Sequence, residues 1–88
     1  MINKSAHLKI LEDIYFAVSK RKNTSKKNSY TAKLFKQGNK KIAQKVLEES
    51  AELTIDFLKG SKKRTIEEAS DLIYHIIVML NKKGIIIV

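Results

Sequence analysis

The chain has 88 residues, carries a net charge of +9 and contains no Pro, Cys or Trp. A chain of this length forms at most one domain with a modest core, which we expect to cover residues 1–88. The absence of Cys excludes disulfides, thiolate metal sites and cysteine nucleophiles. It also suits a cytoplasmic protein, and the N-terminus lacks the apolar run of a signal peptide. No stretch approaches the roughly 18 apolar residues of a membrane span, so we expect no membrane partner.

The positive charge is open to more than one interpretation. An excess of basic residues is typical of proteins that bind nucleic acid, a membrane surface or a phosphorylated small molecule. However, sixteen of the eighteen basic residues are Lys, and Lys, Ile and Asn are all over-used, as in proteins from AT-rich genomes. Nucleic-acid sites usually depend on Arg for bidentate contacts. We therefore favour compositional bias as the explanation of the positive charge. A phosphate-bearing small-molecule partner comes second, and a nucleic-acid partner is the least favoured.

The N-terminal third of the chain predicts one long helix and one loop. Apolar residues recur at intervals of three and four between Leu8 and Val18, which predicts a helix over residues 6–20. Ser5 is its expected N-cap. Residues 20–28 contain no apolar side chain at all, so we expect a solvated loop there.

A short helix is predicted over residues 29–36. Ser29 is its expected N-cap and Gly38 its expected stop. The free backbone amides at the start of this helix have two interpretations: they bind a phosphate, or they are satisfied by ordinary capping.

Two long helices follow, separated by Gly60. The third is predicted over residues 39–59 with Asn39 as N-cap, and the fourth over residues 62–82. Beyond Asp71 the fourth helix is apolar on nearly every side. A helix of that kind is buried on every side. A monomer of four helices hardly supplies this cover, so we expect a helical oligomer.

Six of the nine acidic residues lie in two short runs, one in each long helix. Glu52 and Glu68 are each eight residues from Gly60, and Glu49 and Asp71 are each eleven residues from it. A helical hairpin that turns at Gly60 would therefore bring four carboxylates to one height. Helical projection also places the acidic stripe of the third helix at the border of its apolar face. A charge run that only solvates a helix would lie opposite the core.

Four carboxylates in one small volume would repel one another strongly without a cation between them. Oxygen ligands suit Mg²⁺, with Mn²⁺ as the alternative. The i+3 positions lack the His of a di-iron carboxylate bundle, which argues against iron. Mg²⁺ held by carboxylates usually also takes water and phosphate oxygens, so the cluster favours phosphoanhydride hydrolysis.

Simpler interpretations of the same residues stay open. Thr65 and Glu68 match a capping box, so Glu68 would only cap a helix that starts late. The acidic residues of the third helix would pair with neighbouring Lys on a wet surface. His75 is either an outer partner of the metal site or a hydrogen-bonded core histidine.

Three segments resemble the phosphoribosyl-ATP pyrophosphohydrolases of histidine biosynthesis: residues 29–34 (SYTAKL), 41–52 (KIAQKVLEESAE) and 67–75 (EEASDLIYH). The similarity runs from about Leu11 to Ile85. The acidic pattern alone marks the wider superfamily of all-α nucleotide pyrophosphohydrolases, and the first and last segments narrow it to this family. The resemblance implies an all-α, four-helix bundle built on an antiparallel helical hairpin and completed by association into a homodimer or a higher homo-oligomer.

The resemblance also implies Mg²⁺-dependent hydrolysis of phosphoribosyl-ATP to phosphoribosyl-AMP and pyrophosphate. It implies four metal ligands: Glu49, Glu52, Glu68 and Asp71. Glu48 would support the site or activate the water. Lys33, Lys41 and Lys45 are our candidates for the substrate phosphates, on position and charge alone. A house-cleaning pyrophosphatase for dUTP or dCTP is the alternative within the superfamily, and a basic helical module that binds nucleic acid is the alternative outside it.

Overall fold

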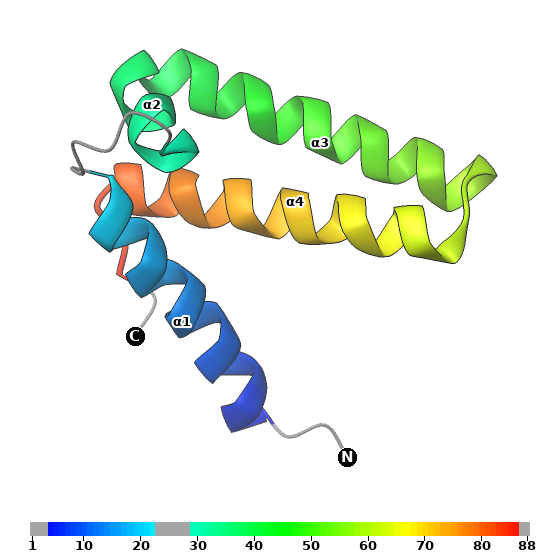
Figure 1. Cartoon of the computed structure of the whole chain (residues 1–88), viewed down its shortest axis with the longest axis horizontal. Coiled ribbons are helices and arrows are strands. Elements are labelled where there is room, and N and C mark those ends of the chain that lie inside the picture. Colours follow the sequence, from blue (N-terminus) through cyan, green and yellow to red (C-terminus); the bar gives the residue numbers. More distant parts are fainter. Residues whose placement is uncertain (1–3, 23–28, 87–88) are drawn as a thin grey trace.

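The structure is a computed structural model that describes residues 4–22 and 29–86. This part of the chain holds four α-helices and no strand: α1 (Lys4–Arg21), α2 (Tyr30–Gln37), α3 (Asn39–Lys59) and α4 (Lys62–Lys82). The predicted all-α class is confirmed, and so is the hairpin at Gly60. α3 and α4 run antiparallel and side by side, while α1 and α2 gather at the end of the hairpin that lies away from the turn (Figure 1).

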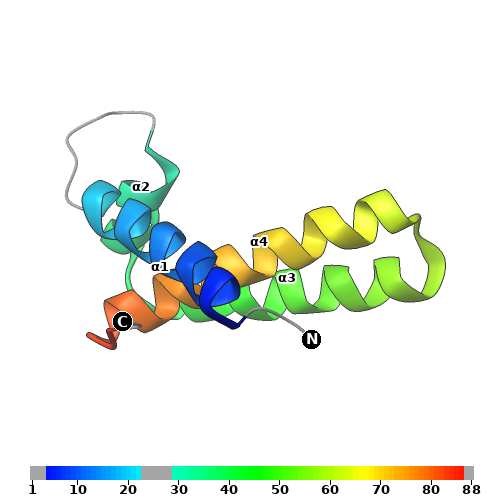
Figure 2. The same ribbon diagram turned by 90° about the horizontal axis from the view of Figure 1, so that it is seen from below.

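The core lies where α1 and α2 pack against this end of the hairpin. Its most buried side chains are at most 1% exposed and come from all four helices: Val18, Leu34, Ile42 and Val78. Figure 2 shows that the half of the hairpin nearest the turn extends beyond α1 and α2. No residue between Ser50 and Glu67 is buried in that half. The interior of the chain is therefore concentrated at one end.

Two serines and one glycine fix the helix boundaries. Ser29 caps α2, because its Oγ accepts a hydrogen bond from the backbone N–H of Ala32 at 3.2 Å. Ser61 caps α4 in the same way through Arg64 N–H at 3.1 Å. Gly38 separates α2 from α3 with a φ of +90°, a conformation that favours glycine. The predicted roles of Ser29 and Gly38 are confirmed.

Two predicted N-caps are wrong, and one predicted loop starts late. Ser5 lies inside α1, which already includes Lys4. Asn39 is the first residue of α3, and Gly38 occupies the capping position without a side-chain bond. The loop predicted over residues 20–28 starts later than expected, because α1 continues to Arg21. Residues 23–28 of that prediction lie outside the described part of the chain.

Thr65 links the two helices of the hairpin by a hydrogen bond and does not cap a helix that starts late. Since α4 begins at Lys62 and is capped by Ser61, Thr65 is already helical, and the alternative interpretation of Thr65 and Glu68 as a capping box does not hold. Its Oγ1 donates to the backbone carbonyls of Asp56 at 3.1 Å and Ser61 at 2.9 Å. The first bond joins the start of α4 to the end of α3 and so helps to fix the register of the two helices.

A single chain leaves large apolar side chains of the hairpin exposed. Within α4, Ile77 and Val78 are buried, but Ile73 is 42% exposed. On α3, Leu47 and Phe57 are 73% and 74% exposed. A single chain therefore does not bury α4 on every side, and the oligomer that was expected to do so stays a prediction. None of the helices in the described ranges combines the length and apolar run of a transmembrane helix.

Candidate metal centre

Three carboxylates meet across the hairpin. Each of Glu49, Glu68 and Asp71 offers a carboxylate oxygen, and these oxygens lie within 4.8 Å of one another. α3 supplies the first and α4 the other two, as the count from Gly60 predicts. Glu49 and Glu68 are only 7% and 4% exposed, whereas Asp71 is exposed. Two carboxylates of the cluster are therefore buried, and the third is open to solvent.

Each buried carboxylate has one paired oxygen and one orphaned oxygen. Oε1 of Glu49 lies 3.4 Å from the Nζ of Lys45, and Oε1 of Glu68 lies 2.8 Å from Nη2 of Arg64. Within the described part of the chain, Oε2 of each glutamate is buried without a hydrogen-bond partner. Unpaired buried carboxylate oxygens are costly. A hard cation ligated by both Oε2 atoms would remove that cost, so these residues fit Mg²⁺ or Mn²⁺.

The crowding of negative charge changes the titration of Glu68. Burial, together with the neighbouring Glu52, raises the pKa of Glu68 to about 7, against the opposing effect of Arg64. Glu49 adds to the same rise. Without a metal the cluster thus retains a proton at neutral pH more readily than an isolated glutamate does.

Glu52 and Glu48 lie at the margin of the cluster. Glu52 is exposed and neighbours Glu68, but it is not one of the three mutually close carboxylates. Glu48 is exposed and accepts hydrogen bonds from Gln44 at 2.7 Å and from Lys45 at 3.3 Å. These bonds lower the pKa of Glu48. The structure therefore gathers three of the four predicted ligands, and the ligand roles themselves stay predictions.

The three predicted phosphate partners lie in different surroundings. Lys33 is exposed on α2, and Lys41 is half-buried on α3. Lys45 is half-buried and forms ion pairs with Glu48 and Glu49 at 3.3 and 3.4 Å. Although burial opposes it, hydrogen bonding to these glutamates raises the pKa of Lys45. Of the three lysines, Lys45 is the one whose described contacts place it at the carboxylates.

His75 is a hydrogen-bonded core histidine, as one of the two interpretations predicted. It is 6% exposed, and its Nδ1 lies 2.7 Å from the backbone oxygen of Asp71. Because that oxygen only accepts, Nδ1 carries the proton. In the neutral ring Nε2 is then an acceptor, so the hydroxyl of Tyr30, at 2.8 Å, donates to it. His75 therefore joins α2 to the backbone of a cluster residue.

A second contact between α2 and α4 lies beside the first. The Oγ1 of the buried Thr31 is hydrogen-bonded to the hydroxyl of Tyr74. The rings of Tyr74 and His75 pack edge to face with centroids 5.1 Å apart. Burial raises the pKa of Tyr30, with Lys45 opposing and Glu49 contributing, so its hydroxyl feels the charges of the cluster. Helical periodicity predicts no role for Tyr30 or Tyr74, and the available signal was that they lie in segments 29–34 and 67–75, which resemble the family.

Arg64 is a neighbour of the cluster and was not among the predicted site residues. Its guanidinium pairs with Glu68 at 2.8 Å, Asp56 at 3.7 Å and Glu67 at 3.8 Å. The i, i+4 spacing between Arg64 and Glu68 was a readable signal for this ion pair.

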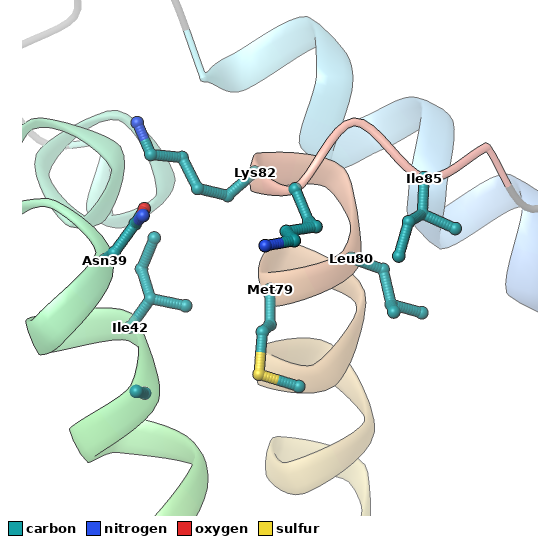
Figure 3. A pocket seen from close by; sticks show the side chains of 8 residues that line it. Asn39, Ile42, Met79, Leu80, Lys82 and Ile85 are labelled. Carbon is teal, nitrogen blue, oxygen red and sulfur yellow. The ribbon is translucent and has the colours of Figure 1, made fainter.

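A pocket of about 570 Å³ lies apart from the carboxylates. It opens between the start of α3 and the end of α4, where Ile42 and Met79 form part of an apolar wall (Figure 3). Lys82 and Asn39 lie at its edge. It has no acidic lining residue in the described part of the chain, so it offers a divalent metal no carboxylate ligand.

Comparison with known proteins gives one consistent family. A family model described as phosphoribosyl-ATP pyrophosphohydrolase matches residues 11–87. The phosphoribosyl-ATP pyrophosphatase of Azospirillum brasilense is 42% identical over 86% of this chain and 68% of its own length. That of Sulfolobus acidocaldarius is 44% identical over 81% of this chain and 75% of its own. A histidine biosynthesis bifunctional protein of Buchnera aphidicola is 47% identical over 85% of this chain. The match spans only 35% of that longer relative.

Proposed function

Because the chain belongs to the phosphoribosyl-ATP pyrophosphohydrolase family, we propose that it hydrolyses phosphoribosyl-ATP to phosphoribosyl-AMP and pyrophosphate in histidine biosynthesis. Two relatives that it matches over at least two thirds of their length are named for this activity. The observation that carries the chemistry is the pair of buried, unpartnered Oε2 atoms on Glu49 and Glu68. No feature of the described residues favours the dUTP or dCTP pyrophosphatase, or the nucleic-acid-binding module, over this reaction.

We assign Mg²⁺ as the metal, held by Glu49, Glu68 and Asp71, with Glu52 as a fourth ligand from the same side of α3. Bound Mg²⁺ would offset the negative charge of the phosphates and activate a water molecule. The mixture of buried and exposed carboxylates supports this assignment, since it leaves one face of the cluster open to a phosphate oxygen and a water.

The remaining side chains bind phosphate and accept the proton. Lys45 already lies against Glu48 and Glu49, so its ammonium group can contact the anionic leaving pyrophosphate without a large movement. Lys41 lies one turn earlier on α3, and Lys33 lies on α2. Glu48 lies beside Lys45 at the margin of the cluster, so we assign it a supporting role or the activation of the attacking water. One water molecule is consumed as the phosphoanhydride bond is split into phosphoribosyl-AMP and pyrophosphate.

A pair of adjacent glutamates tests this proposal. Glu68 is buried in the cluster, whereas Glu67 is exposed and, among the described residues, forms one ion pair, with Arg64 at 3.8 Å. Glu68→Gln should lower Mg²⁺-dependent pyrophosphate release from phosphoribosyl-ATP by at least about 100-fold, because loss of a ligand exceeds the usual 10- to 100-fold cost of losing an outer partner. Glu67→Gln removes the same charge and should stay within about threefold of the parent. Glu52→Gln should behave like Glu68→Gln.

The same assay with dUTP and dCTP distinguishes the family reaction from a house-cleaning activity. Faster hydrolysis of either nucleotide than of phosphoribosyl-ATP would overturn the substrate assignment. If Glu68→Gln and Glu67→Gln lost activity equally, the carboxylate cluster would not be the metal site. Circular dichroism of each variant checks that the helices are retained.

We propose further that the chain works as a homodimer or a higher homo-oligomer. The exposed apolar side chains of the hairpin support this, since Leu47, Phe57 and Leu58 are each more than 70% exposed. Exposed apolar side chains that lie together on a surface usually mark a protein interface. The cytoplasmic location expected from the sequence stays a prediction.

A further inference from the structure

Arg64 bridges both helices of the hairpin over a buried carboxylate. Its Nη2 lies 2.8 Å from Oε1 of Glu68, whose side chain is 6% exposed. The same guanidinium reaches Oδ2 of Asp56 on α3 at 3.7 Å and Oε2 of Glu67 at 3.8 Å. The Arg64 side chain itself is 54% exposed. One partly exposed cation therefore serves three carboxylates, and one of them belongs to the candidate metal centre.

This cation has a different effect in the two states of the site. Without a metal, Glu49, Glu68 and Asp71 repel one another, and the charge of Arg64 partly offsets that repulsion. A guanidinium cannot lose its proton at any working pH, so this charge is permanent. When Glu68 ligates a divalent cation, the same permanent charge lies next to an ion of its own sign.

We propose that Arg64 is a built-in counter-ion of the candidate metal centre, which stabilises the metal-free fold and weakens the binding of a divalent cation at Glu68. This inference rests on the proposed function, because it takes the carboxylate cluster to be a metal site. It assigns Arg64 a positioning and electrostatic role and no contact with the reacting atoms.

The expected effect is large enough to measure. The positive charge of Arg64 contacts a carboxylate that would ligate the dication. In surroundings as polar as water, a unit positive charge at such a separation weakens the binding of the dication by about tenfold. The Arg64 side chain is about half exposed, so the polar limit is the appropriate one. Mobile ions screen such an interaction, and at about 1 M salt the Debye length falls to about 3 Å. The effect should therefore shrink as salt is added.

The test compares Arg64→Gln with Lys63→Gln, which removes the same charge from the neighbouring position. Lys63 is exposed, and the ion pairs of the described residues do not include it. Isothermal titration with MgCl₂ alone, at low ionic strength, should give Arg64→Gln an Mg²⁺ affinity about tenfold higher than the parent chain. Lys63→Gln should change it by no more than about twofold. Arg64→Lys keeps the charge and should stay closer to the parent than Arg64→Gln does.

Thermal unfolding gives an independent reading. Metal-free Arg64→Gln should melt below metal-free Lys63→Gln, and saturating Mg²⁺ should remove that difference. If Arg64→Gln binds Mg²⁺ no more tightly than Lys63→Gln does, the inference is overturned while the metal site stands. If the parent chain binds no Mg²⁺ at all, the proposed metal centre fails and the inference fails with it.

Discussion

The hydrogen bond from Tyr30 to His75 should stabilise the fold, and Tyr30→Phe removes only this bond. The substitution deletes the hydroxyl that donates to Nε2 of His75 at 2.8 Å and leaves the ring in place. His75 is 6% exposed, so its Nε2 is left without a partner in a buried position. An orphaned buried acceptor costs about 1–3 kcal/mol. Tyr30 is itself 47% exposed, and a water molecule can enter where the hydroxyl was, so we take the lower end, about 1 kcal/mol.

This cost converts into a measurable shift in melting temperature. Unfolding entropies of about 2.1 cal/mol/K per residue give about 0.18 kcal/mol/K for a chain of this size, so Tyr30→Phe should lower the melting temperature by about 5 °C. The assay is thermal unfolding followed by far-UV circular dichroism, at one protein concentration throughout because association would shift the result.

A double-mutant cycle isolates the bond. Tyr30→Phe should cost about 1 kcal/mol in the parent chain and close to nothing in a His75→Leu background. An equal cost in both backgrounds would refute the bond. Nitrogen chemical shifts of His75 should also show the neutral tautomer with its proton on Nδ1, since the Asp71 carbonyl can only accept. The opposite tautomer would refute the assigned direction of both bonds.

Two further predictions concern the metal and the apolar surface. The pKa of Glu68 is raised to about 7, so between the ordinary value of 4.5 and about 7 the folded chain binds more protons than the unfolded chain. The stability of the metal-free chain should therefore fall as pH rises through this window. The stabilisation by Mg²⁺ should grow over the same window, because the metal competes with that proton for Glu68. Melting curves with and without Mg²⁺ at several pH values test this, and a gain that is larger in acid would contradict it. Phe57→Lys should shift sedimentation towards the monomer, whereas Gln37→Lys, which adds the same charge at another exposed position, should not.

The register of the hairpin could be predicted from the sequence by counting. Two antiparallel helices rise by the same amount per residue, so residues equidistant from Gly60 come level, and this places Glu49 beside Asp71. The count could not settle how far each carboxylate faces the partner helix. Glu52 follows Glu49 by three residues, which turns it by about 60° around the helix axis, and in the structure it is exposed while Glu49 is buried.

Other features depend on contacts that local patterns do not encode. The bond between Tyr30 and His75 joins residues 45 apart in sequence, and no periodicity predicts it. The true cap of α4 is Ser61, four residues before the Thr65 of the apparent capping box. Ser and Thr are both common N-cap residues. Which of the two caps α4 therefore depends on the residue at which the turn at Gly60 ends and the helix begins. The apolar pattern of α4 correctly predicts a helix, but it cannot say how much of that helix a single chain covers.

The uneven distribution of the interior has a consequence for the opening motions of the hairpin. Between Ser50 and Glu67 no residue is buried, so backbone amides there should exchange with solvent faster than those near Val78. Glu49 and Glu68 are the buried positions next to this region on α3 and α4. Fraying that starts at the turn therefore reaches the carboxylates before it reaches the core. An ion bound between the two helices would hold them together. The gain in amide protection on adding Mg²⁺ should therefore be greatest between the carboxylates and the turn at Gly60.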